Sequence, residues 1–166
     1  MKHLFFLSLA AVIMLLDPGS PRAADVLKQR NIGMELARDI ASEAVLACRK
    51  AGYQVGVVVV DRGANVRAAL RDDVAARFTL ELAERKANMA IMSGVPTGEM
   101  VQNRADIRQE LNQIEGLIML RGGLPILVGG HRVGAVGVSG APGGDKDEAC
   151  ARAALDELAE RIEFAD

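Results

Sequence analysis

The stretch YQVGVVVVDRGANVRAALR, from Tyr53 to Arg71, fixes the strand direction of the predicted sheet. Residues 53–60 are rich in β-branched side chains and predict a strand that is buried on both faces or nearly so. Residues 61–65 have the composition of a hairpin turn, and residues 66–71 are the expected returning strand. Because a short glycine-containing loop joins two apolar runs, the sequence predicts an antiparallel pair.

The rest of the chain extends this pair into an α+β domain. Residues 124–128 and 133–139 predict a second hairpin with its turn at 129–132, and a short strand is expected at 117–120. Helices are expected over residues 26–50, 72–93, 97–110 and 145–164, with Asp72 or Asp73 capping the second and Thr97 the third. The hairpins favour an antiparallel sheet, which argues against a doubly wound α/β fold.

The first residues are typical of a signal peptide. Lys2 precedes an apolar run from Leu4 to Leu16, which is too short to span a bilayer comfortably. The small residues Ala23 and Ala24 offer a cleavage site. The sequence therefore predicts a signal peptide over residues 1–24, a single domain over residues 25–166, and a periplasmic or secreted location. A formal net charge of −2 argues against nucleic-acid binding.

The glycine-rich stretch at residues 133–155 does not predict a nucleotide-binding site. It lacks the Gly-Lys-Ser/Thr of a phosphate-binding loop and the Gly-x-Gly-x-x-Gly of a dinucleotide fingerprint. A tight turn before an acidic helix start is the simpler interpretation. Gly134 and Gly137 lie inside a predicted strand, where glycine indicates a close approach to the backbone. The approaching group is either a packed helix or a flat ligand.

Two basic residues are candidate anion partners. Lys86 shares an apolar helix face with Phe78, Leu82 and Met89, so it either extends its charge to solvent, pairs within the protein, or meets a ligand carboxylate. Arg71 ends the second predicted strand and is the other candidate. Its alternative partners are Asp72 and Asp73.

Candidate iron ligands are few. Met89 is either core or a thioether ligand. His131 lies in a predicted turn, where it is either solvated or a ligand. The sequence shows no zinc-ligand spacing and no Ser-His-Asp arrangement. Cys48 and Cys150 either form a disulfide, as an exported chain allows, or are small buried apolar residues.

Five segments in order resemble the GlcG/HbpS-like family of haem-binding and haem-degrading domains. They are VGVVVVDRGANVRAALR, ERKANMA, SGVPT, RGGLPILVGGHRVGAVGVSGA and the overlapping AVGVSGAPGGDKDEACARAAL. The resemblance covers residues 37–158. In ERKANMA the family commonly continues to a threonine where this chain has Met89.

The resemblance implies a profilin-like fold with a five-stranded antiparallel sheet, assembled as a dimer or larger oligomer. It implies haem as the cofactor, with Lys86, Met89, Arg71, His131, Gly137 and Ser139 as candidate contacts. Because the family's first and last strands are neighbours, it also implies that Cys48 and Cys150 lie close enough to form a disulfide.

We therefore expect an exported haem-binding protein, with haem degradation or redox and haem sensing as further roles of some family members. The alternative is a non-enzymatic accessory module that binds a small carboxylate or a partner protein in an exported oxidation system. Expected partners are other copies of the chain and a membrane sensor or periplasmic oxidoreductase. No residue pattern settles whether the protein is an enzyme.

Overall fold

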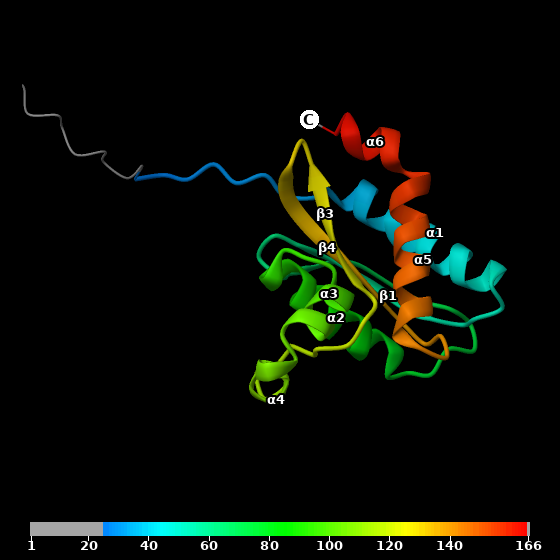
Figure 1. The fold of residues 1–166 in the computed structure, drawn as a ribbon. Helices are drawn as coiled ribbons and strands as arrows, with labels where there is room; N and C mark the ends of the chain where they lie inside the picture. The colour runs from blue at the N-terminus through cyan, green and yellow to red at the C-terminus, as the bar shows by residue number, and fades with distance from the viewer. Residues whose placement is uncertain (1–24, 166) are drawn as a thin grey trace, which may run out of the picture.

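The computed structural model describes residues 25–165 (Figure 1). The predicted signal peptide lies outside the described residues. Within that range no helix is long and apolar enough to cross a membrane. The elements, in chain order, are α1 (Met34–Lys50), β1 (Gly56–Asp61), β2 (Val66–Arg71), α2 (Thr79–Ser93), α3 (Thr97–Asn103), the 3-10 turn η1 (Ala105–Ile107), α4 (Arg108–Leu111), β3 (Gly123–Val128), β4 (His131–Ser139), α5 (Gly144–Glu157) and α6 (Ala159–Glu163).

The sheet is antiparallel, as predicted, and its strand order is β2-β1-β4-β3. The expectation of five strands is wrong, because the described residues form a four-stranded sheet. Residues 117–120 do not form the extra strand. The Arg85 guanidinium donates a hydrogen bond to the Leu117 carbonyl at 3.0 Å, and the Met119 amide donates to Asn112 Oδ1 at 2.8 Å. Side chains therefore pair backbone groups that a strand would present to a neighbour.

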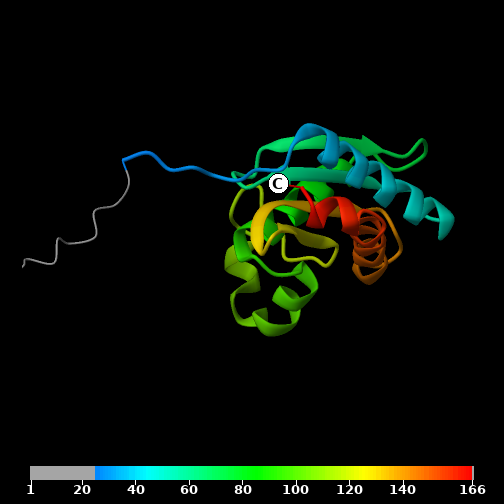
Figure 2. The ribbon, with the colours of Figure 1, turned by 90° about the horizontal axis from the view of Figure 1, so that it is seen from above.

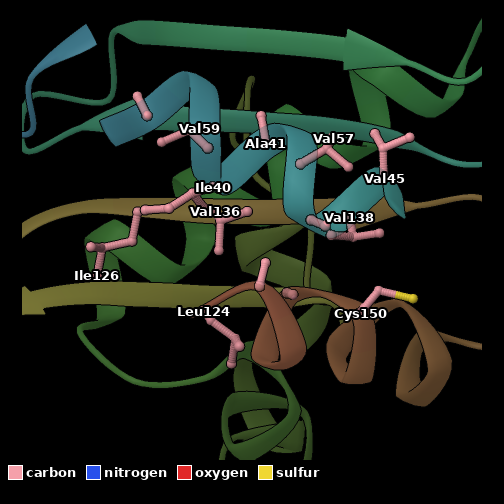
Figure 3. Close-up of a cluster of buried hydrophobic side chains, with 14 of the residues drawn as sticks. Ile40, Ala41, Val45, Val57, Val59, Leu124, Ile126, Val136, Val138 and Cys150 are labelled. Carbon is pink, nitrogen blue, oxygen red and sulfur yellow. The ribbon is translucent and has the colours of Figure 1, made fainter. Parts of the chain in front are cut away.

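The sheet lies between two helical layers, which Figures 1 and 2 show from two sides. Along β1 the side chains of Val57 and Val59 belong to the core beneath α1 and α5, while Val58 and Val60 face α2. Strand β1 is therefore buried on both faces, as its continuous valine run predicts. Figure 3 shows the α1–α5 side of this core. The arrangement is α+β, and the profilin-like topology stays a prediction.

Glycines let α2 approach the sheet closely. A Cβ atom on Gly137 of β4 would overlap the Ala83 carbonyl and lie 2.7 Å from the Ala87 amide nitrogen. A Cβ atom on Gly123 of β3 would overlap the carbonyl of Lys86. Of the two alternatives for Gly137, the structure shows the packed helix. Both glycines seat the same turn of α2, the turn that carries Lys86.

Several helix boundaries differ from the predictions. Helix α2 begins at Thr79 and not at residue 72, because Asp72 is buried and accepts a hydrogen bond from Arg49 Nε at 3.2 Å. The third predicted helix breaks at Arg104, where φ is −130°. Thr97 does not cap it, since its fully buried hydroxyl accepts the Gly123 amide at 2.9 Å. The last predicted helix is interrupted at Leu158, where α6 follows α5.

A disulfide joins the first long helix to the last. Cys48 of α1 and Cys150 of α5 are bonded, with a Cα–Cα distance of 5.2 Å and a sequence separation of 102. The antiparallel pairing of β1 with β4 brings these helices together on one face of the sheet. This is the pair that the family resemblance implied would be neighbours.

Candidate functional site

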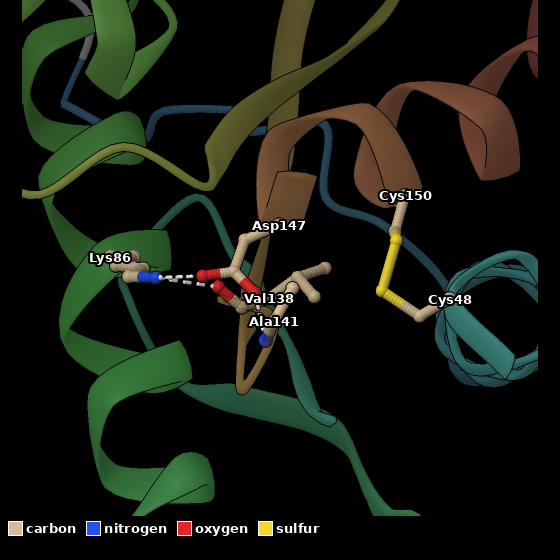
Figure 4. Close-up of a disulfide and its surroundings, with 6 residues drawn as sticks. All are labelled: Cys48, Lys86, Val138, Ala141, Asp147 and Cys150. Atoms are coloured by element: carbon tan, nitrogen blue, oxygen red, sulfur yellow. Dashed lines mark hydrogen bonds and ion pairs between the residues drawn. A yellow bond between two sulfur atoms is a disulfide. The ribbon is translucent and has the colours of Figure 1, made fainter. Parts of the chain in front are cut away.

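Lys86 makes a buried ion pair with Asp147 (Figure 4). The Lys86 side chain extends from α2 toward the last residues of β4, and its ammonium lies 2.7 Å from Asp147 Oδ2 and 2.9 Å from the Val138 carbonyl oxygen. Only 3% of each residue's surface is exposed. Lys86 therefore does not extend its charge to solvent, and the intramolecular pair is the alternative that the structure shows.

Asp147 connects the start of α5 with α2 and with the β4–α5 loop. It lies near the start of α5, and its second oxygen, Oδ1, accepts the Ala141 amide at 2.9 Å. Burial raises the pKa of this carboxyl above its ordinary value, and the charge and hydrogen bond of Lys86 act in the opposite direction. The pair fixes the β4–α5 loop against α2.

A cavity of about 800 Å³ opens beside this pair. Its apolar walls come from the start of α2, from α3 and from the segment before β3, through Phe78, Leu82, Val101 and Leu120. We call the end of β4 and the start of α5 its polar wall, and further polar side chains come from α2, α4 and the segment before β3. The polar side chains that line it are Thr79, Lys86, Arg108, Arg121, Ser139, Asp145 and Asp147.

Two arginines at this cavity have no partner among the described residues. Arg121 is half-buried and Arg108 is exposed, and the guanidinium group of neither makes a hydrogen bond or ion pair with residues 25–165. Lys86 and Asp147 neutralise each other, so the remaining lining charges are these two arginines and the exposed Asp145. The cavity thus combines apolar walls with an excess of positive charge, which suits an amphipathic anion.

The predicted contacts do not all lie at this cavity. Lys86 and Ser139 line it. Met89 is fully buried in a separate apolar cluster with Leu117 and Met119.

The remaining candidates lie farther apart in the fold. Arg71 is exposed at the end of the edge strand β2 and donates to the Ala75 carbonyl, so it pairs with neither Asp72 nor Asp73. His131 is exposed at the start of β4. Within residues 25–165, no group of three His, Cys, Asp or Glu side chains could hold a metal ion.

Sequence reasoning missed both cavity arginines. Arg121 opens the motif RGGLP, which was recognised for its glycines and proline. Gly123 of this motif lies against the backbone of α2, and Gly122 lies against Val138 and Asp147, so the position just before them is a usable signal. Arg108 had none, because it lies in a segment with weak helical periodicity.

A family model described as haem degrading protein HbpS-like matches residues 32–156. The chain belongs to the HbpS-like family. The match takes in α1 through most of α5, and therefore the cavity and the disulfide. No curated protein sequence matches the chain.

Solved structures share this fold. A double mutant of HbpS from Streptomyces reticuli is 37% identical with a TM-score of 0.76, and the alignment covers 85% of this chain and 96% of that one. ORFY of Klebsiella pneumoniae is 25% identical with a TM-score of 0.75, over 83% of this chain and 97% of that one. The PduOC:heme complex is 21% identical with a TM-score of 0.68, over 76% and 94%, and is a likeness of fold.

Proposed function

We propose that this HbpS-like protein binds haem in the cavity beside Lys86. The observation that carries the proposal is the combination of apolar walls with the unpartnered Arg108 and Arg121 in a chain of this family. Haem is a flat apolar macrocycle with two carboxylates on one edge. Such a ligand needs an apolar slot with cations at one side.

The size of the cavity supports the proposal. Its volume of about 800 Å³ lies within the roughly 300–1,000 Å³ typical of ligand and cofactor sites. Phe78 and Leu82 would contact the ring, and Arg121 and Arg108 would take the carboxylates through charge-assisted hydrogen bonds. Lys86 would act indirectly, because its bond to Asp147 holds the polar wall in place.

The described lining of the cavity offers no usual ligand for haem iron. Of the described residues that line the cavity, none is His, Met, Cys or Tyr, the usual protein ligands of haem iron. Met89 and His131, the ligands suggested by the sequence, lie elsewhere in the fold. Bound haem would supply redox-active iron, and this chain's own residues would supply the pocket and the charge.

Titration of hemin into the purified protein, followed by its visible absorbance, tests the proposal. We expect saturable binding to one site per chain. Arg121→Gln should weaken it by about tenfold or more, since a charged hydrogen bond is lost. The control Arg67→Gln changes an exposed arginine of β2 outside the cavity and should have no effect. Binding without saturation, or equal affinity for both variants, would remove the proposal and leave the small-carboxylate or partner-binding alternative.

We also propose that the chain is exported and self-associates. A buried disulfide is in keeping with an oxidising compartment. Intact mass of the protein recovered from its native cell should give a mature chain that begins near Asp25. Light scattering should give a mass of two chains or more. A full-length mass would contradict export, and a monomer would contradict self-association. A membrane sensor or periplasmic oxidoreductase as partner stays a prediction.

A further inference from the structure

A haem site often binds both the organic part of haem and its iron, but the cavity beside Lys86 offers contacts for the organic part alone. It offers contacts for the ring and for the carboxylates, and its lining side chains offer no imidazole, thioether, thiolate or phenol for the metal. Affinity at such a site must come from the organic part of the ligand.

We infer that the cavity is a binding site for tetrapyrrole dicarboxylates as a class, with or without iron. The inference rests on the proposed haem site and extends it to metal-free porphyrins. Arg121 and Arg108 would bind the two carboxylates of the ligand. The apolar wall that includes Phe78 and Leu82 would contact its ring.

The charges around the cavity indicate that the two arginines, and not Lys86, bind the ligand carboxylates. Lys86 is not available to a ligand carboxylate as a free cation, because its ammonium already bonds Asp147 Oδ2 at 2.7 Å and the Val138 carbonyl at 2.9 Å. The two arginines have no partner among residues 25–165. A guanidinium can form two parallel hydrogen bonds to one carboxylate, so two arginines match the two carboxylates of the porphyrin edge.

The apolar side of the cavity supports binding of the porphyrin ring without iron. Phe78 is 54% exposed although it is a large apolar residue, and it lies where the chain enters α2 at the edge of the cavity. The Arg77 guanidinium lies over one face of the Phe78 ring, 4.0 Å from its centroid, so a flat ligand would stack on the opposite face. Stacking of this kind depends on the π face of the macrocycle. Iron at the centre of the ring is not needed for such a contact.

Three ligands separate the contributions. Hemin, protoporphyrin IX and protoporphyrin IX dimethyl ester are each titrated into the purified protein and followed by their absorbance bands. We expect protoporphyrin IX to bind within about threefold of hemin and the dimethyl ester at least about tenfold more weakly, because the ester lacks the charges that the arginines recognise. Arg121→Gln should weaken both dicarboxylates and leave the ester unchanged, with Arg67→Gln as the control.

The outcomes distinguish this inference from the proposed function. If hemin saturates the protein and protoporphyrin IX does not bind, iron carries the affinity, and the inference is overturned while haem binding stands. If the ester binds as well as the free acid, the arginines do not recognise the ligand, which also overturns it. If neither hemin nor protoporphyrin IX binds, the proposed function itself fails. Because the three ligands are compared on the unmodified protein, a poorly folding variant cannot obscure the result.

Discussion

The ammonium nitrogen of Lys86 lies 2.7 Å from Oδ2 of Asp147, although 61 positions separate the two residues in the sequence. Both residues are almost fully buried, and the pair closes the polar wall of the cavity. An ion pair in such a place is costly to disturb from one side only, because the remaining charge stays buried without a partner.

Removal of Lys86 should therefore destabilise the protein strongly. We expect Lys86→Met to lower the free energy of unfolding by about 3–5 kcal/mol at neutral pH, measured by urea denaturation. The double variant Lys86→Met/Asp147→Leu replaces both charges by apolar groups and should recover part of the loss. A double variant that loses the sum of the two single effects would show that the residues do not depend on each other.

The same variant should respond to pH in a defined direction. Burial raises the pKa of Asp147 above its ordinary value of 3.8, and without Lys86 that pKa should rise further. A folded state that binds the proton more tightly than the unfolded state gains stability at low pH and loses it as pH rises. The deficit of Lys86→Met relative to the unmodified protein should thus shrink between about pH 7 and pH 4.5 in urea titrations. A deficit that does not change with pH would contradict this account.

Asp72 should show the opposite dependence. A hydrogen bond from Arg49 lowers the pKa of Asp72 below its ordinary value. The folded state then binds the proton less tightly than the unfolded state, so the contribution is present above the ordinary value of 3.8 and disappears as pH falls through the lowered one. Asp72→Asn should be less stable than the unmodified protein near neutral pH, and the difference in thermal unfolding should shrink as pH falls below 3.8. Asp73→Asn, at the exposed neighbouring residue, is the matched control.

Loss of the disulfide should weaken the fold through the unfolded state. The Cys48–Cys150 bond closes a loop of about 100 residues, for which the chain-entropy model gives about 4–5 kcal/mol. We expect Cys48→Ser and Cys150→Ser each to lose about 2–5 kcal/mol of unfolding free energy, and the double variant to lose no more than either. Treatment of the unmodified protein with a reductant should give the same loss. An additive double variant would show that the sulfurs act separately.

A methyl group at Gly137 should also be harmful. A Cβ atom there would overlap the backbone of α2 at Ala83, and backbone atoms cannot move aside as a side chain does. We expect Gly137→Ala to cost about 1–3 kcal/mol or more in chemical denaturation. Gly33→Ala is the control, because nothing lies within 4 Å of the added atom and the cost should be about 1 kcal/mol or less. Similar losses in the two variants would argue against close packing of α2 on β4.

Local patterns predicted the parts of the fold that depend on local interactions. The hairpins β1–β2 and β3–β4 follow from their turns and apolar runs, and the structure confirms them. The start of α2 was wrong because Asp72 is occupied by Arg49, a residue 23 positions earlier. The extra strand at 117–120 was wrong because distant side chains, including Arg85, pair its backbone.

The candidate site was harder to predict for the same reason. The position of Lys86 on an apolar helix face makes it a candidate, but its partner Asp147 lies in the acidic helix start after the glycine-rich turn, and no local pattern joins the two. The cavity depends on how α2, α3 and the β4–α5 loop meet, which no local pattern describes. Arg121 and Arg108 acquire their position only from that arrangement.

The disulfide encloses more than two helices. Every residue that lines the cavity, from Ala76 to Asp147, lies between Cys48 and Cys150 in the sequence. A protease that cuts one exposed loop between the cysteines therefore yields two fragments that remain covalently joined. On a denaturing gel the nicked protein would migrate as a single species until a reductant separates the two fragments. Both walls of the cavity would stay on one molecule.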